Sequence, residues 1–196
     1  MKIRIAFTGS SGTGKTVLAK KLAELLGLPF NPVGARSVAQ DMGFDTPYQI
    51  DQTGRRKEFQ QRLTATKVEW ETKNESFGTD RSTLDNLAYD TLHSPLASDA
   101  DGISQAVDQA RTYTQVFFCP VASFINVVSD PARISNLAYQ DMYEALLLGL
   151  HTKYEIRQIR IPYGDLDKRH QFVQSVATLK WPGLGPDGRS TSADPR

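Results

Sequence analysis

The sequence predicts an α/β fold in three layers, with a five-stranded parallel sheet between two layers of helices. Two observations support this prediction. Apolar, strand-like segments alternate with segments of helical periodicity along most of the 196 residues, an arrangement typical of parallel sheets with helical crossovers. A glycine-rich turn also joins the first predicted strand to the first predicted helix, and open α/β sheets gather their ligands at this edge.

The first half of the chain supplies three of the expected strands. Residues 2–8 alternate and then become apolar, which predicts a buried strand. Residues 28–34 contain two prolines, but their place after the first helix still predicts a short second strand. The polar region 47–73 predicts a long helix, and residues 75–80 the third strand. The inward side chains of this helix are expected to be Phe59, Leu63, Val68 and Trp70.

The second half supplies two more strands. Residues 114–120 are the clearest interior strand after the first, and residues 155–162 alternate into a fifth. Helices are expected around these strands, over residues 82–93, 98–113, 138–154 and 165–180.

Composition limits the class of protein. We expect one domain over residues 1–180, followed by a flexible tail over residues 181–196. The apolar runs are far shorter than the roughly 18 residues of a membrane span. A single cysteine, Cys119, excludes an internal disulfide and fits a cytoplasmic protein. A net charge of +1 supplies no overall field for nucleic acid, which is therefore not the favoured partner, and a homodimer stays open.

The glycine-rich turn has a specific pattern. Its sequence GSSGTGKT matches the phosphate-binding loop, G-x-x-x-x-G-K-[ST]. The glycines let backbone N–H groups turn toward phosphate oxygens, Lys15 adds a mobile positive charge, and the Thr16 hydroxyl can ligate Mg²⁺. We therefore predict that ATP contacts Gly9, Ser10, Ser11, Gly12, Thr13, Gly14, Lys15 and Thr16.

A second informative stretch, TDRSTLDNLAYD, follows the third predicted strand. Asp80 is expected at the carboxyl end of that strand, where a carboxylate can hold Mg²⁺ or take a proton from an acceptor hydroxyl. Arg81 can clamp a phosphate by two parallel hydrogen bonds. The sequence leaves open whether Asp80 is a base or only a metal ligand.

The residues Asp80-Arg81, followed after three residues by DNLAY, resemble the Asp-Arg signature of thymidylate kinases. They are also similar to the corresponding segment of the nicotinamide riboside kinase-like family of small, AAA-type and often phage-encoded P-loop kinases. The resemblance implies a P-loop kinase fold in which the Asp-Arg pair organises metal and phosphates. It also implies that the next helix, with Asp85 and Tyr89, lines the acceptor pocket.

The same resemblance implies two further parts of the site. A small lid is expected at about residues 129–140, with Arg133 closing over the transferring phosphates. Tyr163 and Gly164 stand where related kinases hold the adenine ring.

The expected acceptor is inferred from a carboxylate that this chain lacks. Nucleoside kinases of this group usually carry a carboxylate base after strand two, whereas this chain has Asn31 and no acid before Asp41. Arg36 stands where a basic residue can meet an acceptor phosphate. A phosphate acceptor needs no deprotonation, so a (deoxy)nucleoside monophosphate is the predicted acceptor. The alternatives are a hydroxyl acceptor (a nucleoside, nicotinamide riboside, or a modified base or end in DNA) and a P-loop ATPase switch that is not a kinase.

Overall fold

A four-stranded parallel sheet forms the centre of the protein. The computed structural model describes residues 2–93, 100–121 and 136–181. The strands are β1 (Arg4–Thr8), β2 (Phe77–Asp80), β3 (Gln115–Phe118) and β4 (Ile159–Arg160). Their order across the sheet is β2-β1-β3-β4, and every pair is parallel. In this register Phe7 pairs with Asp80, so the end of β2 lies beside the end of β1.

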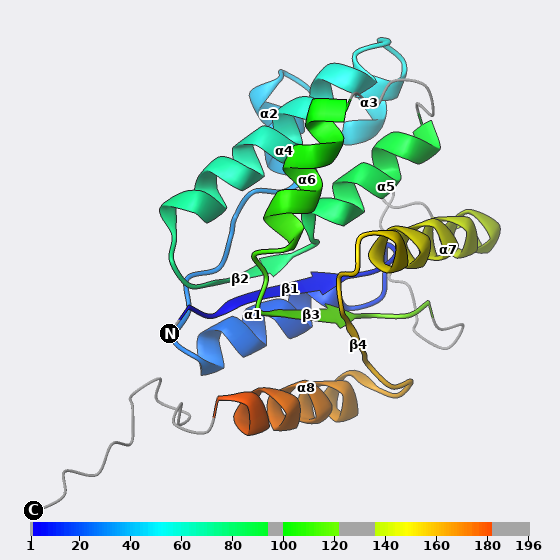
Figure 1. The fold of residues 1–196 in the computed structure, drawn as a ribbon. Coiled ribbons are helices and arrows are strands. Elements are labelled where there is room, and N and C mark those ends of the chain that lie inside the picture. Colours follow the sequence, from blue (N-terminus) through cyan, green and yellow to red (C-terminus); the bar gives the residue numbers. More distant parts are fainter. Residues whose placement is uncertain (1, 94–99, 122–135, 182–196) are drawn as a thin grey trace, which may run out of the picture.

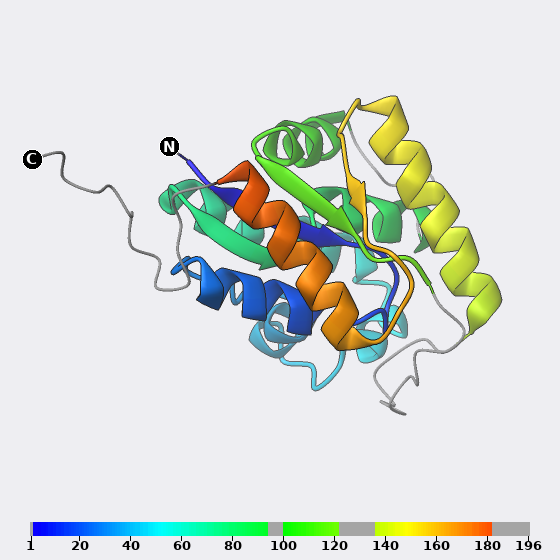
Figure 2. The ribbon, with the colours of Figure 1, turned by 90° about the horizontal axis from the view of Figure 1, so that it is seen from below.

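Helices cover both faces of the sheet (Figures 1 and 2). One face is covered by α1 (Lys15–Leu25) and α8 (Leu166–Lys180). The other is covered by α4 (Arg56–Lys73), α5 (Thr83–His93), α6 (Ala100–Ala110) and α7 (Leu137–Lys153). Two short helices, α2 (Ala35–Asp41) and α3 (Pro47–Asp51), pack against α4. The predicted three-layer α/β architecture is therefore confirmed.

Strand alternation divides the core between the two faces. Ile5, Phe7 and Phe117 pack with the leucines of α1 and with α8, whereas Ala6 and Phe118 pack with α5, α6 and α7. Successive side chains of a strand point to opposite faces, and both faces of this sheet are covered. That is why the strands read as apolar runs.

The sheet has one strand fewer than predicted among the described residues. In place of the second strand, Phe30 forms an isolated bridge with Gly78. The Asn31 N–H donates to the Gly78 carbonyl at 2.9 Å, and the Gly78 N–H donates to the Pro29 carbonyl at 3.0 Å. Pro29 and Pro32 have no N–H to donate, so the ladder cannot extend past this point.

Three other boundaries differ from the prediction. The expected helix 47–73 is divided into α3 and α4 by a turn in which Gly54 has φ 71°. The predicted strand 155–162 is only two residues long. Trp181, expected to begin the tail, is 4% exposed and belongs to the α1–α8 core. The folded part therefore extends at least to this residue.

Most of the predicted lid and tail lies outside the described residues, and Arg133 is among the positions not described. The end of the predicted lid is described and is helical: Asn136 caps α7, and Gln140 lies in its first turn.

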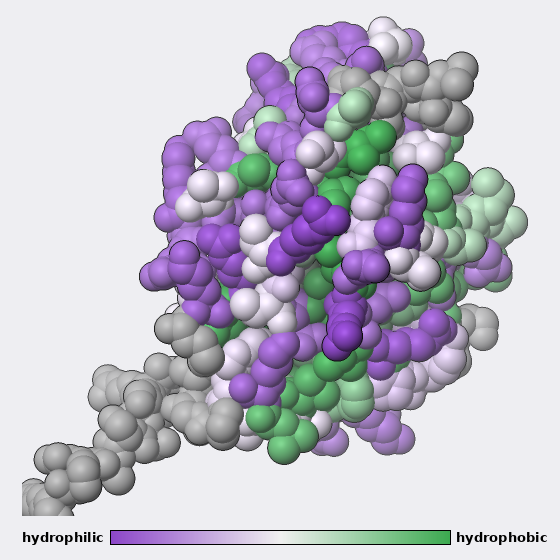
Figure 3. All heavy atoms as spheres, in the orientation of Figure 1, coloured by the Kyte–Doolittle hydropathy of each residue, from purple (hydrophilic) through white to green (hydrophobic). Residues whose placement is uncertain are grey.

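The surface is mixed in character. On the face seen in Figure 3, hydrophilic and hydrophobic side chains are interspersed. Within the described ranges, none of the helices combines the length and apolarity that crossing a membrane requires.

Candidate active site

The loop between β1 and α1 takes conformations that favour glycine. Gly9, Gly12 and Gly14 have φ values of 132°, 78° and 80°, which L-residues rarely adopt. At Gly9 a Cβ would also lie 2.3 Å from the carbonyl oxygen of Cys119, just after β3. The loop is therefore pressed against the end of a neighbouring strand.

Lys15 is buried inside this loop, with 4% exposure. Its Nζ donates to the Ser10 carbonyl and to the Thr13 hydroxyl, the latter at 3.2 Å. Burial, assisted by repulsion from Arg81, lowers the pKa of Lys15 to about 8, although Asp80 pulls in the opposite direction. An anion bound here would favour the charged ammonium.

Side chains of two helices donate hydrogen bonds to carbonyl groups of the loop. Arg169 of α8 donates from Nη1 to the Thr13 carbonyl at 2.7 Å, and Gln140 of α7 donates to the Ser11 carbonyl at 3.3 Å. Sequence reasoning missed both residues. A signal existed for Arg169, because it falls on the same face of α8 as the buried Val173 and Ala177. A charged residue on an apolar stripe indicates a buried partner.

Thr16 and Asp80, the two residues expected to hold Mg²⁺, contact each other although 64 residues separate them. The Thr16 hydroxyl donates to Asp80 Oδ2, and Asp80 Oδ1 is buried without a hydrogen-bond partner among the described residues. Mg²⁺ prefers such oxygen ligands, and it is commonly held by one or two protein groups together with substrate phosphates. The described residues contain no cluster of three or more His, Cys, Asp or Glu side chains able to enclose a metal. The pair thus fits Mg²⁺ of the phosphate-bound kind.

Arg81 follows β2 in a left-handed conformation, with φ 70°. Its N–H donates to the Phe7 carbonyl at 2.7 Å, which extends the β1–β2 ladder. The guanidinium lies 4.8 Å from the centre of the Tyr89 ring and donates to the hydroxyls of Tyr89 at 3.2 Å and Tyr143 at 3.3 Å. A non-glycine residue in this conformation costs about 1–2 kcal/mol, and such strain clusters at functional sites.

Asp85 is the buried centre of a hydrogen-bond network. One oxygen accepts from the Gly9 N–H at 3.2 Å and from Tyr143 at 2.9 Å. The other accepts from Thr8 at 2.6 Å and from the Ser82 N–H and hydroxyl, both at 2.8 Å. Burial raises the pKa of Asp85, but Arg81 and the bond from Thr8 outweigh it and leave the pKa below its usual value. These contacts indicate a positioning role, because Asp85 does not line the cavity described next.

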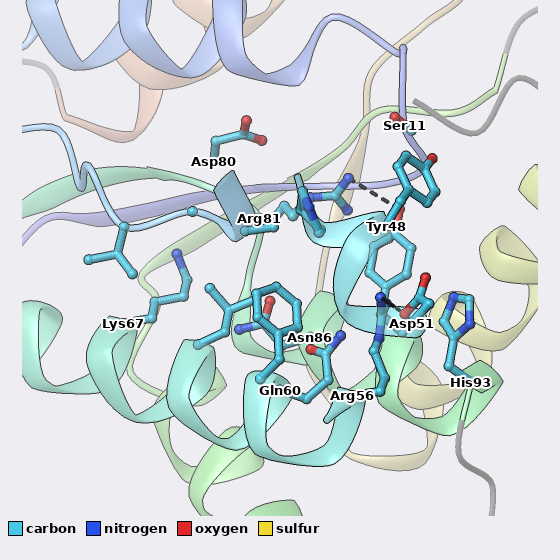
Figure 4. A pocket seen from close by; sticks show the side chains of 17 residues that line it. Ser11, Tyr48, Asp51, Arg56, Gln60, Lys67, Asp80, Arg81, Asn86 and His93 are labelled. Carbon is cyan, nitrogen blue, oxygen red and sulfur yellow. Dashed lines mark hydrogen bonds and ion pairs between the residues drawn. The ribbon is translucent and has the colours of Figure 1, made fainter. Parts of the chain in front are cut away.

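A cavity of about 140 Å³ opens beside the loop, between α4, α5 and the α2–α3 region (Figure 4). Ser11, Asp80 and Arg81 line it at the loop. The other lining residues are Val33, Gly34, Ala35, Pro47, Tyr48, Asp51, Arg56, Phe59, Gln60, Leu63, Lys67, Asn86, Tyr89 and His93. Tyr89, an expected acceptor contact, thus borders the cavity.

Other predicted site residues lie elsewhere. Arg36 is exposed on α2 and does not line the cavity. Tyr163 is 57% exposed, and Gly164 follows it in the turn before α8. This turn leads into the helix that carries Arg169, so it lies on the α8 side of the loop. Sequence reasoning also missed Lys67, the buried lysine of the cavity wall.

Comparisons with known proteins agree with this architecture. Residues 4–169 match the model of a protein family described as AAA domain. None of the curated proteins matches the sequence.

Solved structures of small kinases are similar in fold. Deoxyadenosine kinase from M. mycoides with bound dATP is 12% identical and has a TM-score of 0.62, over 90% of this chain and 99% of that one. Thymidylate kinase from Ehrlichia chaffeensis is 15% identical, with a TM-score of 0.53 over 89% and 98%. NadR protein in complex with NAD and AMP-PNP is 14% identical, with a TM-score of 0.60; the match covers 100% of this chain but only 52% of that one. The phosphate-binding loop, the parallel sheet and the matched domain together place this chain in the AAA domain family, with a fold like that of small P-loop kinases.

Proposed function

We propose that this chain transfers the γ-phosphoryl group of ATP to a (deoxy)nucleoside monophosphate. The observation that supports this most strongly is that one cavity is lined by Ser11 of the phosphate-binding loop and by the Asp80-Arg81 pair. An acceptor in that cavity would face phosphates held by the loop. Transfer between two bound molecules requires this kind of juxtaposition.

Each part of the proposed site has a separate task. The loop N–H groups and Lys15 hold the phosphates, and the dipole of α1 favours negative charge at the same place. Thr16 and Asp80 would hold Mg²⁺, which neutralises charge on the phosphates when it is bound. Arg81 supplies positive charge toward the transferring group. We keep Tyr163 and Gly164 as proposed adenine contacts and Arg133 as a proposed lid residue.

The carboxylates of the cavity favour an acceptor that is already ionised. Of the two that line it, Asp51 is paired with Arg56 at 2.7 Å and Asp80 accepts from Thr16. Asn31, which stands where a base was sought, turns its amide toward Glu71 at 3.1 Å. A phosphate oxygen requires no base, so this arrangement suits a monophosphate better than a hydroxyl.

One observation supports a hydroxyl acceptor as the second candidate. Asp80 Oδ1 is buried and has no hydrogen-bond partner in the described part of the chain, so it has the capacity to accept a proton from a nucleoside hydroxyl.

A panel of acceptors tests the proposal. The purified protein is incubated with Mg²⁺ and ATP and with each deoxynucleoside monophosphate, each nucleoside, nicotinamide riboside or a DNA oligonucleotide, and both ADP and phosphorylated acceptor are measured. We expect ADP formation that depends on a monophosphate and yields a diphosphate. A phosphorylated hydroxyl would establish the second candidate instead. ADP formation that no acceptor changes would refute both and indicate an ATPase switch.

A further inference from the structure

A buried lysine lines the cavity beside β2, the strand that ends at Asp80. The side chain of Lys67 is 2% exposed, yet it belongs to the cavity wall. Its Nζ donates to the hydroxyl of Thr79, the residue before Asp80, and lies 3.1 Å from Glu71 Oε1. An ammonium carries three N–H donors. These two contacts therefore leave one donor without a partner among the described residues.

The position of Lys67 on α4 assigns it to the end of the cavity that Asp80 lines. The buried residues of this helix recur at helical spacing and form one face: Phe59, Gln60, Leu63, Lys67 and Glu71. In Figure 4, Lys67 and Asp80 lie toward one side of the pocket, Ser11, Asp51 and His93 lie toward the other, and Arg81 lies between them. A group that reaches Lys67 is therefore near Asp80, which is followed in the chain by Arg81.

Glu71, the ion-pair partner of Lys67, is satisfied by other groups. Its carboxylate accepts from Asn31 at 3.1 Å, from Gln109 at 2.7 Å and from the Tyr113 hydroxyl at 2.9 Å. A buried ion pair is weak evidence for stability, because apolar residues of similar volume often serve as well or better. Folding therefore does not explain why a lysine occupies this wall.

The carboxylates that balance the two cations of this region lie behind them. Glu71 pairs with Lys67, and Asp85 lies 3.5 Å from Arg81 Nη1. Both carboxylates are fully buried and neither lines the cavity, whereas both cations do. The wall thus presents two positive groups toward the space that an acceptor would fill.

We propose that Lys67 and Arg81 together bind the phosphate of the acceptor, and that Glu71 and Thr79 hold the Lys67 ammonium in position. The proposal rests on the function proposed above and names the group of the acceptor that is recognised. Charge-assisted hydrogen bonds to an ionised phosphate are about twice as strong as neutral ones. Lys67 therefore takes the part that sequence analysis expected of Arg36.

A paired substitution tests this without leaving a buried charge. Lys67→Gln alone would leave the buried Glu71 carboxylate with hydrogen bonds but without its cation, which threatens folding, so we choose Lys67→Met/Glu71→Gln. The matched control is Lys73→Met/Glu69→Gln, which removes an exposed ion pair of the same helix with the same spacing. Dissociation constants are measured for ATP, for the four deoxynucleoside monophosphates and for the corresponding nucleosides.

We expect the Lys67/Glu71 variant to bind monophosphates about 10- to 100-fold more weakly than the wild type. Its affinity for ATP and for nucleosides should stay within about twofold, and the control should match the wild type throughout. Undiminished monophosphate binding would show that Lys67 only pairs with Glu71 and does not bind the acceptor phosphate. An equal loss for monophosphates, nucleosides and ATP would show a structural disturbance. Either result overturns the proposal.

Failure of this proposal can be told from failure of the proposed function. If the wild type binds monophosphates in a way that requires Lys67 but phosphorylates none of them, the function is wrong and the binding site is right. If the wild type phosphorylates a monophosphate and the variant keeps the same KM, the function is right and the role of Lys67 is wrong.

Discussion

Replacement of Asp85 by asparagine probes the network that joins the phosphate-binding loop to Arg81. Both carboxylate oxygens accept hydrogen bonds, and each of them accepts one from a backbone N–H: Gly9 on one side and Ser82 on the other. Hydroxyl partners can rotate to suit an amide, but a backbone N–H cannot. Whichever way the new amide points, its NH₂ group faces one of these two donors.

The structure sets the size of the effect. One stranded backbone N–H costs about 1–3 kcal/mol. The half-buried Arg81 also loses its carboxylate partner at 3.5 Å, and breaking a buried pair costs about 3–5 kcal/mol in full. The Arg81 side chain keeps 25% exposure and its two tyrosine contacts, which reduces the second contribution. We therefore expect Asp85→Asn to destabilise the protein by about 3–5 kcal/mol.

Urea unfolding followed by far-UV circular dichroism measures this difference. Asp108→Asn is the matched control. It also breaks a pair between an aspartate and an arginine, at 3.4 Å from Arg111, but both of these side chains are exposed. Such exposed pairs contribute about 0–1 kcal/mol. A loss below about 1 kcal/mol for Asp85→Asn would refute the view that this carboxylate holds the site together.

Three further changes test the phosphate-binding loop. Gly9→Ala places a Cβ 2.3 Å from the Cys119 carbonyl oxygen and should destabilise the protein in urea unfolding by about 3 kcal/mol, whereas Gly149→Ala, in an open helical position, should gain about 0.5–1 kcal/mol; equal effects would contradict the close approach. Because the pKa of Lys15 is lowered to about 8, its charge is lost as pH rises through that value, so calorimetry should show ATP affinity falling up to about tenfold per pH unit above it. Lys15→Met should bind weakly with no such fall, and a wild-type affinity independent of pH would contradict this role. Arg169→Met removes a 2.7 Å bond to the loop and should weaken ATP binding about tenfold; unchanged affinity would show that the bond is dispensable.

Local patterns predicted most of the fold. Strand one is followed by a turn rich in glycine and then by a helix with a leucine face, and each of these signals lies within a few residues. The prediction of a second strand was wrong because a strand needs hydrogen-bond partners along its length. Phe30 pairs with Gly78, but the neighbouring prolines lack the N–H groups that would continue the ladder. The fifth predicted segment pairs over two residues only, Ile159 and Arg160.

Part of the candidate site could likewise be predicted from the sequence, and part could not. The phosphate-binding loop could be predicted because its residues are consecutive and its chemistry belongs to the backbone and to Lys15. The position of Asp80 near the loop could be predicted from its place at the end of a strand, since parallel strands end at the same edge of the sheet. The cavity could not, because its walls come from α2, α3, α4 and α5, and which side chains face one another depends on how these helices pack.

Helix α4 shows why the sequence does not reveal which charged residues are buried. It carries two Lys–Glu pairs at four-residue spacing, Lys67 with Glu71 and Glu69 with Lys73. In sequence both resemble ordinary surface pairs, and Val68 was expected to point inward. In the structure the first pair is fully covered and the second is exposed, because β2, α6 and the segment around Asn31 contribute partners to one side of the helix.

The sequence by itself determined that a phosphate-binding loop stands between a strand and a helix of an α/β fold, because those signals are local. Only the tertiary structure decided which charged side chains line the cavity beside the loop, because the burial of a helix face depends on the elements that pack against it.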